Sequence, residues 1–533
     1  MKKQLVGLGI SILSLGSFNY ALAQDLESLL EGKGEDSAVQ PSQQTRLSFA
    51  VSTLLDKVTS EQRVFLRYIE AQQWNKALLQ FQPAFAGTAF ERTANATALE
   101  ALIKIKAGLE VSGLEQVLQV AEPKKIHSEI LHSLKDSVKE DAFVWEIVQG
   151  NWNSQWTEVF GRGAEVRTRL KQITLKTDLE VLKDMASKTP ANTRERALID
   201  WQLALSYALN DKADEAAKVL AALLKNTKSP ISQDLVNVTA GRLLFQNGYF
   251  DAAIRYYEKV EKKSDYWLDA QEELAWSYLR KGQPQNALAV SKTLMNPALK
   301  GFVGAESYFV SSLGHLKVCD YPQVIEALTV FPKHFRQRAV DLAALSKGEK
   351  QELVNKLIAK MKAGSVSWEQ LGKDAHALPR MVNRDHKLNQ LLKVQVAFEK
   401  EALAAERLYS ESLALTGLQG KFEILKNNLG LRVQNSVSAS VARVQNMADL
   451  EVKDIKRILD KLHIVEAEVI QQVDMAGKLT KHAATQMDVK KGETGAKRAD
   501  ALRFPASSEI WFDELSNFKV DVKKGCQSIK RSM

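Results

Sequence analysis

Two cysteines, Cys319 and Cys526, are the residues of this chain best suited to covalent chemistry. An even pair of cysteines in an oxidising compartment is a candidate disulfide. A bond between residues 319 and 526 would close a long loop. In the chain-entropy description, such a bond stabilises a fold by roughly 4 to 5 kcal/mol at most. The alternative is two unrelated free thiols, with Cys319 buried at a tight contact between helices. The sequence thus predicts a candidate disulfide and leaves the free thiols open.

Signals for catalysis and metal binding are weak. The eight histidines form no His-Glu-x-x-His pair, and neither a phosphate-binding glycine loop nor a Gly-x-Ser-x-Gly turn is present. Glu306-Ser307 resembles the opening of the catalytic motif of soluble lytic transglycosylases, but the Gly-Leu-Met-Gln run expected after it is missing. A glutamate on the wall of a binding groove is the simpler interpretation. We therefore expect no enzyme activity, no metal and no cofactor.

The middle of the chain contains a pattern that recurs at a step of 34 residues. A small residue is followed by Leu or an aromatic residue, a turn glycine and a second small residue. This order describes two closely packed helices and is similar to the tetratricopeptide repeat (TPR), a helix pair of about 34 residues. The predicted packing residues are Ala204, Tyr207, Ala216, Gly241, Leu244, Gly248, Ala253, Ala275, Tyr278, Gly282 and Ala287.

The resemblance to this repeat implies a binding groove. In such arrays the first helix of each pair lines the concave surface, and the same register can be applied here. Aromatic and cationic groups together suit an extended peptide of acidic character, since arginine binds carboxylates bidentately. The alternative is that the tryptophans pack between helices and the arginines are only solvated. The predicted groove residues are Trp201, Arg242, Phe245, Trp276, Arg280, Phe309 and Lys317.

Two long runs without proline follow the array, from Lys387 to Lys426 and from Leu431 to Thr480. Apolar residues recur in them at steps of three and four, which is typical of long amphipathic helices or a coiled coil. Asn427-Asn428-Leu429-Gly430 is a natural turn between the runs. We expect an antiparallel helical hairpin that projects from the array or folds against it. An intermolecular coiled coil is the alternative.

The fold class predicted from these patterns is all-α: a TPR-type α-solenoid of helical hairpins followed by a long antiparallel hairpin or coiled coil. Low proline and glycine content and scarce strand-like alternation agree with it. The predicted division is a signal peptide (1–23), a flexible lead-in (24–45), degenerate helical repeats (46–200), the TPR core (201–345), the hairpin (346–480), and a basic linker with an aromatic docking tail (481–533).

The amino terminus has the features of a secretory signal. Lys2 and Lys3 precede a short apolar run, and Ala21-Leu22-Ala23 supplies the small residues of a cleavage site, so we expect cleavage after Ala23. This style of signal predicts a periplasmic protein with no membrane span in the mature chain. The net charge of +9 favours anionic surroundings such as peptidoglycan or an acidic partner, or only aids solubility. An exported chain is not expected to bind nucleic acid.

Two segments carry a further resemblance. The stretch from Tyr308 to Phe331, and the tail from Trp511 to Leu515 with its later Cys526, look like periplasmic TPR proteins of deltaproteobacteria and Bdellovibrio-like bacteria. That group includes components of the adventurous gliding-motility machinery. The resemblance implies a non-enzymatic adaptor that binds extended segments of protein partners in the cell envelope. The alternative is a structural envelope factor that binds peptidoglycan or another anionic surface directly.

Overall fold

Helices form almost all of the chain that the structure describes. The computed structural model describes residues 43–299, 301–364, 376–415, 417–479, 487–491, 515 and 517–522. The predicted all-α fold is confirmed. The predicted signal peptide, its cleavage site, most of the lead-in and Cys526 lie outside the described residues. The last residues of that lead-in already belong to the first described helix.

The array begins with irregular helical pairs. Phe65 and Ile69 on the second of these helices are fully buried, and Thr59 caps its start in a reciprocal bond with Gln62. Phe85 packs edge-on against Phe65 with 4.9 Å between the ring centroids. The helices of this part are α2 (Gln43–Thr53), α3 (Ser60–Glu70), α4 (Trp74–Phe85), α5 (Ala94–Lys106), α6 (Glu110–Leu118), α7 (Ser128–Ser137), α8 (Trp156–Leu170) and α9 (Leu179–Ser187), with 3-10 turns η1 (Phe90–Arg92), η2 (Pro123–Lys125) and η3 (Phe143–Glu146).

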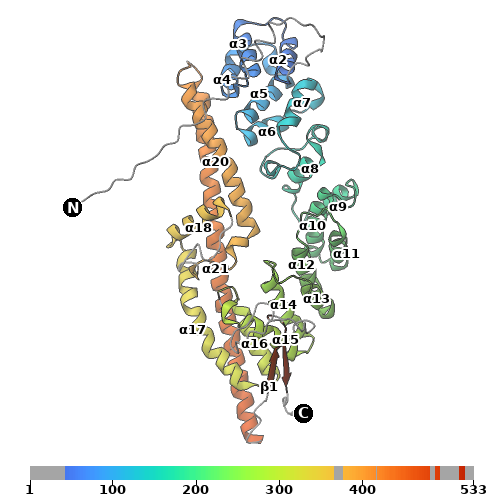
Figure 1. Cartoon of the computed structure of the whole chain (residues 1–533), viewed down its shortest axis with the longest axis vertical. Coiled ribbons are helices and arrows are strands. Elements are labelled where there is room, and N and C mark those ends of the chain that lie inside the picture. The colour runs from blue at the N-terminus through green and yellow to red at the C-terminus, as the bar shows by residue number, and fades with distance from the viewer. Residues whose placement is uncertain are drawn as a thin grey trace, which may run out of the picture.

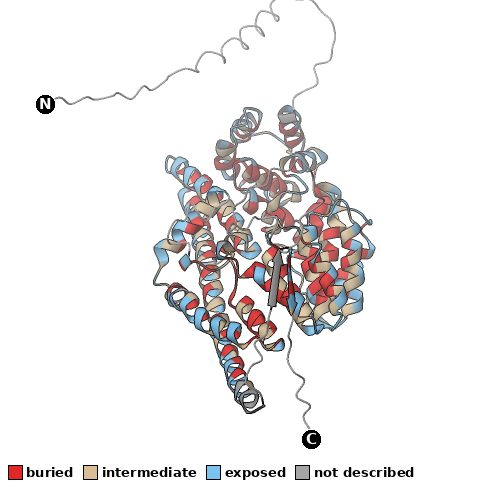
Figure 2. Cartoon of the chain, turned by 60° about the horizontal axis from the view of Figure 1, so that its bottom comes forward, coloured by how far each residue is buried: buried red, intermediate tan, exposed pale blue. Residues whose placement is uncertain are grey.

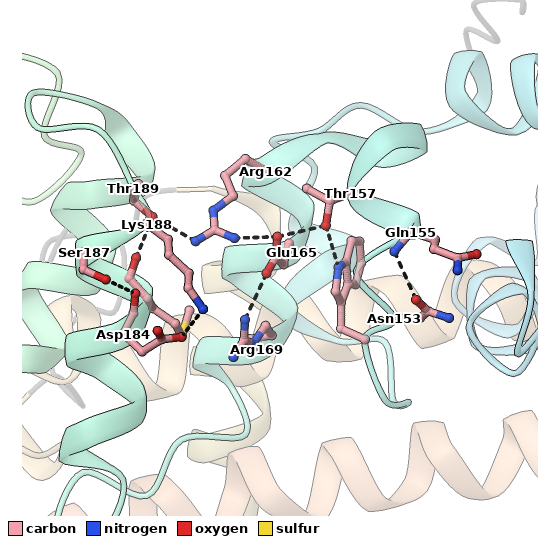
Figure 3. Close-up of polar contacts among 12 residues, drawn as sticks. Asn153, Gln155, Thr157, Arg162, Glu165, Arg169, Asp184, Ser187, Lys188 and Thr189 are labelled. Atoms are coloured by element: carbon pink, nitrogen blue, oxygen red, sulfur yellow. Dashed lines mark hydrogen bonds and ion pairs between the residues drawn. The ribbon is translucent and has the colours of Figure 1, made fainter. Parts of the chain in front are cut away.

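A buried carboxylate joins the irregular part to the regular repeats. Glu165 on α8 is 5% exposed and accepts bonds from Thr157 (2.9 Å), Arg162 (2.6 Å) and Arg169 (3.0 Å). Arg162 also donates to Thr189, just beyond α9, as Figure 3 shows. Burial alone would raise the pKa of Glu165, but the donated hydrogen bonds outweigh it and lower that pKa. The network therefore fixes α8 against α9 where the array changes character.

Regular helical pairs follow from residue 194. Gly248 and Gly282 each have a φ of +80° in the turn inside a pair, a conformation that favours glycine. A Cβ on Gly241 would lie 2.5 Å from the ring of Tyr257, so the absence of a side chain lets the two helices approach. The pairs are α10 (Arg194–Leu209) with α11 (Ala213–Lys225), α12 (Gln233–Gln246) with α13 (Phe250–Tyr257), α14 (Trp267–Arg280) with α15 (Pro284–Leu294), and, after η4 (Pro297–Leu299), α16 (Ala305–Lys317) with α17 (Tyr321–Ser346).

The long hairpin runs across the open side of the curved array, from one end of the array toward the other (Figure 1). α17 and α18 (Gln351–Ala363) lead to η6 (Val382–Arg384), and then α20 (His386–Ser412) and α21 (Gln419–Leu479) run antiparallel. At one end, Ala405 and Phe422 pack into the core of the irregular repeats. At the other end, Val444 and Leu462 share a core with α16 and α17. The hairpin is folded against the array.

The predicted turn at Asn427–Gly430 is wrong. These residues lie inside α21, and the chain reverses between α20 and α21, where Gly417 has a φ of +87°. Leu429 is 2% exposed and packs into the core of the irregular repeats, so burial of its side chain favours continued helix over the local turn preference of two asparagines and a glycine. The 61-residue length of α21 follows from that packing.

Burial follows the expected pattern of a layered helical array. In Figure 2, buried residues gather between paired helices and exposed residues cover the outer surfaces. Near the carboxyl end, β1 (Met487–Lys491) pairs antiparallel with β2 (Phe518–Val522), within the segment predicted as linker and tail. Val520 of β2 packs against Leu288 of α15 and Val318, so the end of the chain contacts the last helical pairs of the array.

Candidate functional site

A pocket of about 420 Å³ lies on the concave side of the array. Its walls come mainly from the first helices of three successive pairs, α12, α14 and α16, with Tyr257 of α13 and Lys461 of α21 of the hairpin. Four of the seven predicted groove residues line it. The pocket residues are Arg242, Phe245, Gln246, Tyr257, Glu273, Trp276, Arg280, Glu306 and Lys461.

Aromatic rings form the apolar part of this pocket and hold it against the hairpin. Trp276 lies 5.7 Å from Phe309 between ring centroids, and Lys461 of α21 places its Nζ 5.1 Å from the centroid of Phe309. Such a cation near a ring face is attracted by the quadrupole of the ring. Phe309 is itself 9% exposed and does not line the pocket. It therefore supports the pocket from behind.

The charged side chains of the pocket differ in how far they are already paired. Arg242 binds Glu273 on the neighbouring first helix through two nitrogens, with N–O distances of 2.5 to 3.0 Å. Arg280 and Lys461 have no ion pair with any described carboxylate. Glu306 lies 3.9 Å from Arg457, a residue that does not line the pocket. Two cations are thus available to an incoming carboxylate, and the third holds adjacent repeats together.

The other predicted groove residues lie elsewhere. Trp201 lines a larger cavity of about 1260 Å³ between the array and the start of α20, and Lys317 is exposed at the end of α16. Lys461 was not among the predicted groove residues. It lies at least 155 positions (461 − 306) from every repeat residue of the pocket and reaches them only through the return of the hairpin. Its position in an amphipathic helix carried no signal of this contact.

Beside the pocket, a cluster of polar side chains, called the strut below, connects α14 to the segment that leads into the hairpin. Glu272 accepts a bond from Ser307 at 2.6 Å and lies 3.9 Å from Arg380, which precedes α20. Burial raises the pKa of Glu272 to about 7, although Arg380 and Ser307 oppose the rise. One helical turn earlier on α14, Asp269 pairs with Arg384 at 2.9 Å. The segment before α20 is thereby fixed to the concave face.

The same segment is fixed to α21. Arg338 of α17 donates to Glu451 of α21 at 2.6 Å, and the backbone N–H of Arg380 donates to the other oxygen of that carboxylate at 2.7 Å. Arg443 of α21 binds Asp385 through two nitrogens, at 2.9 and 2.6 Å. The array, the connecting segment and the hairpin therefore share one charged network next to the pocket.

Cys319 occupies the short turn between α16 and α17. It has a φ of +59° and is disulfide-bonded in the structure. Its predicted partner, Cys526, lies outside the described residues, so the Cys319–Cys526 pairing stays a prediction. The described part of β2 packs against Val318, the residue next to Cys319.

No group of three or more His, Cys, Asp or Glu side chains in the described ranges is arranged to hold a metal ion. Within the same ranges, every helix is too short or too polar to cross a membrane.

Part of the array is similar to a known repeat family. Residues 164–289 match the family described as the ARM repeat of tetratricopeptide repeat protein 21. That segment runs from the middle of α8 into α15 and includes α12 and α14, which form two walls of the pocket. A search of curated proteins finds no match. The chain thus folds as a helical-repeat array, and residues 164–289 of it are similar to the repeats of this tetratricopeptide protein family.

Proposed function

We propose that this chain is a non-enzymatic scaffold whose concave pocket binds an acidic segment of a protein partner. The proposal rests on which cations of the pocket already have a carboxylate partner and which do not. Arg242 is held by Glu273, whereas Arg280 and Lys461 stand beside Trp276 with no carboxylate partner among the described residues. A guanidinium and an ammonium next to an indole ring suit a carboxylate flanked by an apolar group.

The location of the pocket supports the same function. Helical-repeat arrays present preformed surfaces to partners, and a preformed surface loses little conformational entropy on binding. Here the strut around Glu272 and Arg380 holds the hairpin beside the pocket, so Lys461 is in place before a partner arrives. The partner segment has to be slim, because a pocket of about 420 Å³ admits only a few side chains.

We further propose export to a bacterial periplasm, with the partner a component of an envelope complex such as the gliding-motility machinery. The support is the sequence of residues 1–23 and the resemblance of the tail to proteins of that group. A structural factor that binds peptidoglycan directly is the competing function. Pull-down on purified peptidoglycan at low and high salt separates the two, because only the competing function predicts strong retention by the wall polymer.

The decisive experiment reverses the two unpaired pocket charges. The variant Arg280→Glu/Lys461→Glu is compared with wild type by crosslinking in the native envelope and identification of the proteins that co-purify. The matched control is Arg255→Glu/Lys456→Glu, which reverses two exposed, unpaired cations on α13 and α21 away from the pocket. We expect a defined set of partners with wild type and the control, and its loss with the pocket variant. Recovery of the same set from all three proteins would refute the proposal.

A further inference from the structure

A seam of exposed and half-buried side chains runs along α20 on the side that faces the irregular repeats. Cationic and aliphatic side chains alternate along it at steps of three and four residues, so they share one face of the helix. Leu403 is 67% exposed, so its apolar side chain is open to solvent on this face. The seam consists of Lys393, Val396, Lys400, Leu403 and Arg407.

The seam forms one wall of a cavity of about 1030 Å³. The other walls come from α5, α6, α7, the 3-10 turn η3 and the end of α18. They are mostly apolar, with Ile105, Val111 and Phe143 among their residues. Lys393 reaches across with its Nζ 5.4 Å from the centroid of Phe143. The cavity is therefore a groove between α20 and the array, separate from the pocket around Trp276.

The groove carries a surplus of positive charge. Lys393, Lys400 and Arg407 form no ion pair with a described carboxylate. Two carboxylates line the groove. Glu401 is 2% exposed and is bound by the backbone N–H and the hydroxyl of Ser112, at 3.1 and 2.9 Å. Burial raises the pKa of Glu110, and the nearby charge of Lys400 opposes this rise.

We propose that this groove binds an acidic amphipathic helix of a partner protein, lying lengthwise along α20. Cations at the first position of each heptad and aliphatic residues at the fourth match a helix that presents Glu or Asp beside Leu or Ile. The seam from Lys393 to Arg407 spans about 21 Å at the rise of an α-helix, the length of two heptads. The aliphatic residues favour such a helix over a polyanion without side chains that can pack. This site is independent of the pocket in the proposed function.

The test uses a fluorescein-labelled, 21-residue synthetic helix with Glu and Leu at the heptad positions that would meet the seam, and the full chain. Binding is measured by fluorescence anisotropy at low and moderate salt. The seam variant is Lys393→Glu/Lys400→Glu/Arg407→Glu. The matched control is Lys333→Glu/Arg336→Glu/Lys456→Glu, which reverses three exposed cations on α17 and α21 outside the groove. Circular dichroism verifies that all proteins are folded.

We expect saturable binding to wild type and the control, and at least tenfold weaker binding to the seam variant. Leu403→Ala, which leaves the charge unchanged, should weaken binding several-fold, whereas Arg280→Glu/Lys461→Glu should leave it unchanged. Equal loss in the seam variant and the control would show non-specific attraction and overturn the proposal. So would unchanged binding by the seam variant, or a poly-aspartate peptide that binds as tightly as the Glu/Leu helix.

Discussion

The carboxyl group of Glu272 provides a sharp test of how the array is tied to the hairpin. Its side chain is 14% exposed, and it faces Ser307 at 2.6 Å and Arg380 at 3.9 Å. Glu306 and Asp269 add negative charge nearby, while Asp269 itself is paired with Arg384. Burial is the largest cause of the rise in its pKa from 4.5 to about 7. At neutral pH this group is therefore close to its midpoint of titration.

The direction of the effect follows from proton binding. Between pH 4.5 and 7 the folded chain binds the proton of Glu272 and the unfolded chain does not, so this group makes the free energy of unfolding fall as pH rises. Its contribution is fully present below pH 4.5 and is lost as pH passes 7. A rise of this size corresponds to about 3 kcal/mol in total, at about 1.4 kcal/mol for each pKa unit.

The substitution Glu272→Gln isolates this contribution, because an amide stands in for the protonated acid and can still accept a bond from Ser307. We expect wild type and variant to have similar free energies of unfolding in urea at pH 4.5. The variant should be more stable by up to about 3 kcal/mol at pH 8. Glu352→Gln on the exposed face of α18 is the control and should run parallel to wild type. A Glu272→Gln curve that also runs parallel to wild type would show that Glu272 ionises normally and refute the argument.

Three further changes test the packing. Gly241→Ala should lower the free energy of unfolding by about 1 to 3 kcal/mol, because its Cβ would meet the ring of Tyr257 at 2.5 Å; a neutral result in urea unfolding would place that contact elsewhere. Gly430→Ala should raise stability by up to about 1 kcal/mol, since no atom lies within 4 Å of the added Cβ inside α21, whereas a turn there predicts no gain. Glu165→Ala should lower the free energy of unfolding by about 3 kcal/mol, because the guanidinium of Arg162 then loses its carboxylate partner. Thermal unfolding measures this loss, and an unchanged midpoint would contradict the prediction.

The sequence predicts local structure well where a short pattern determines it. The small residues and turn glycines of the repeat indicate the helical pairs, because close helix approach and a positive φ each restrict the residue type. Gly241 and Gly248 illustrate the two cases. The same reasoning places Arg242 and Arg280 on one surface, since they occupy the first helices of successive pairs.

Contacts between distant parts of the chain were beyond that reasoning. Periodicity indicates that α21 is amphipathic, but not that Lys461 approaches Phe309. It also does not show that Arg242 already has a carboxylate partner on the next repeat, which changes its role from binding to positioning. The misplaced turn has the same origin: the buried side chain of Leu429 outweighs the local preference of its neighbours, and this burial depends on the irregular repeats.

The hairpin changes what a repeat array of this kind can do. An array without such a connection contacts only neighbouring repeats along its length, so its curvature can vary as small rotations add up from pair to pair. Here Phe422 is anchored in the core of the irregular repeats and Leu462 in the core shared with α17, at opposite ends of one continuous helix. Any change in curvature would have to break one of these cores or the network around Arg380. The concave surface is therefore held at one width, and selection of partners rests on the shape and charge of the segment that enters rather than on adjustment of the array.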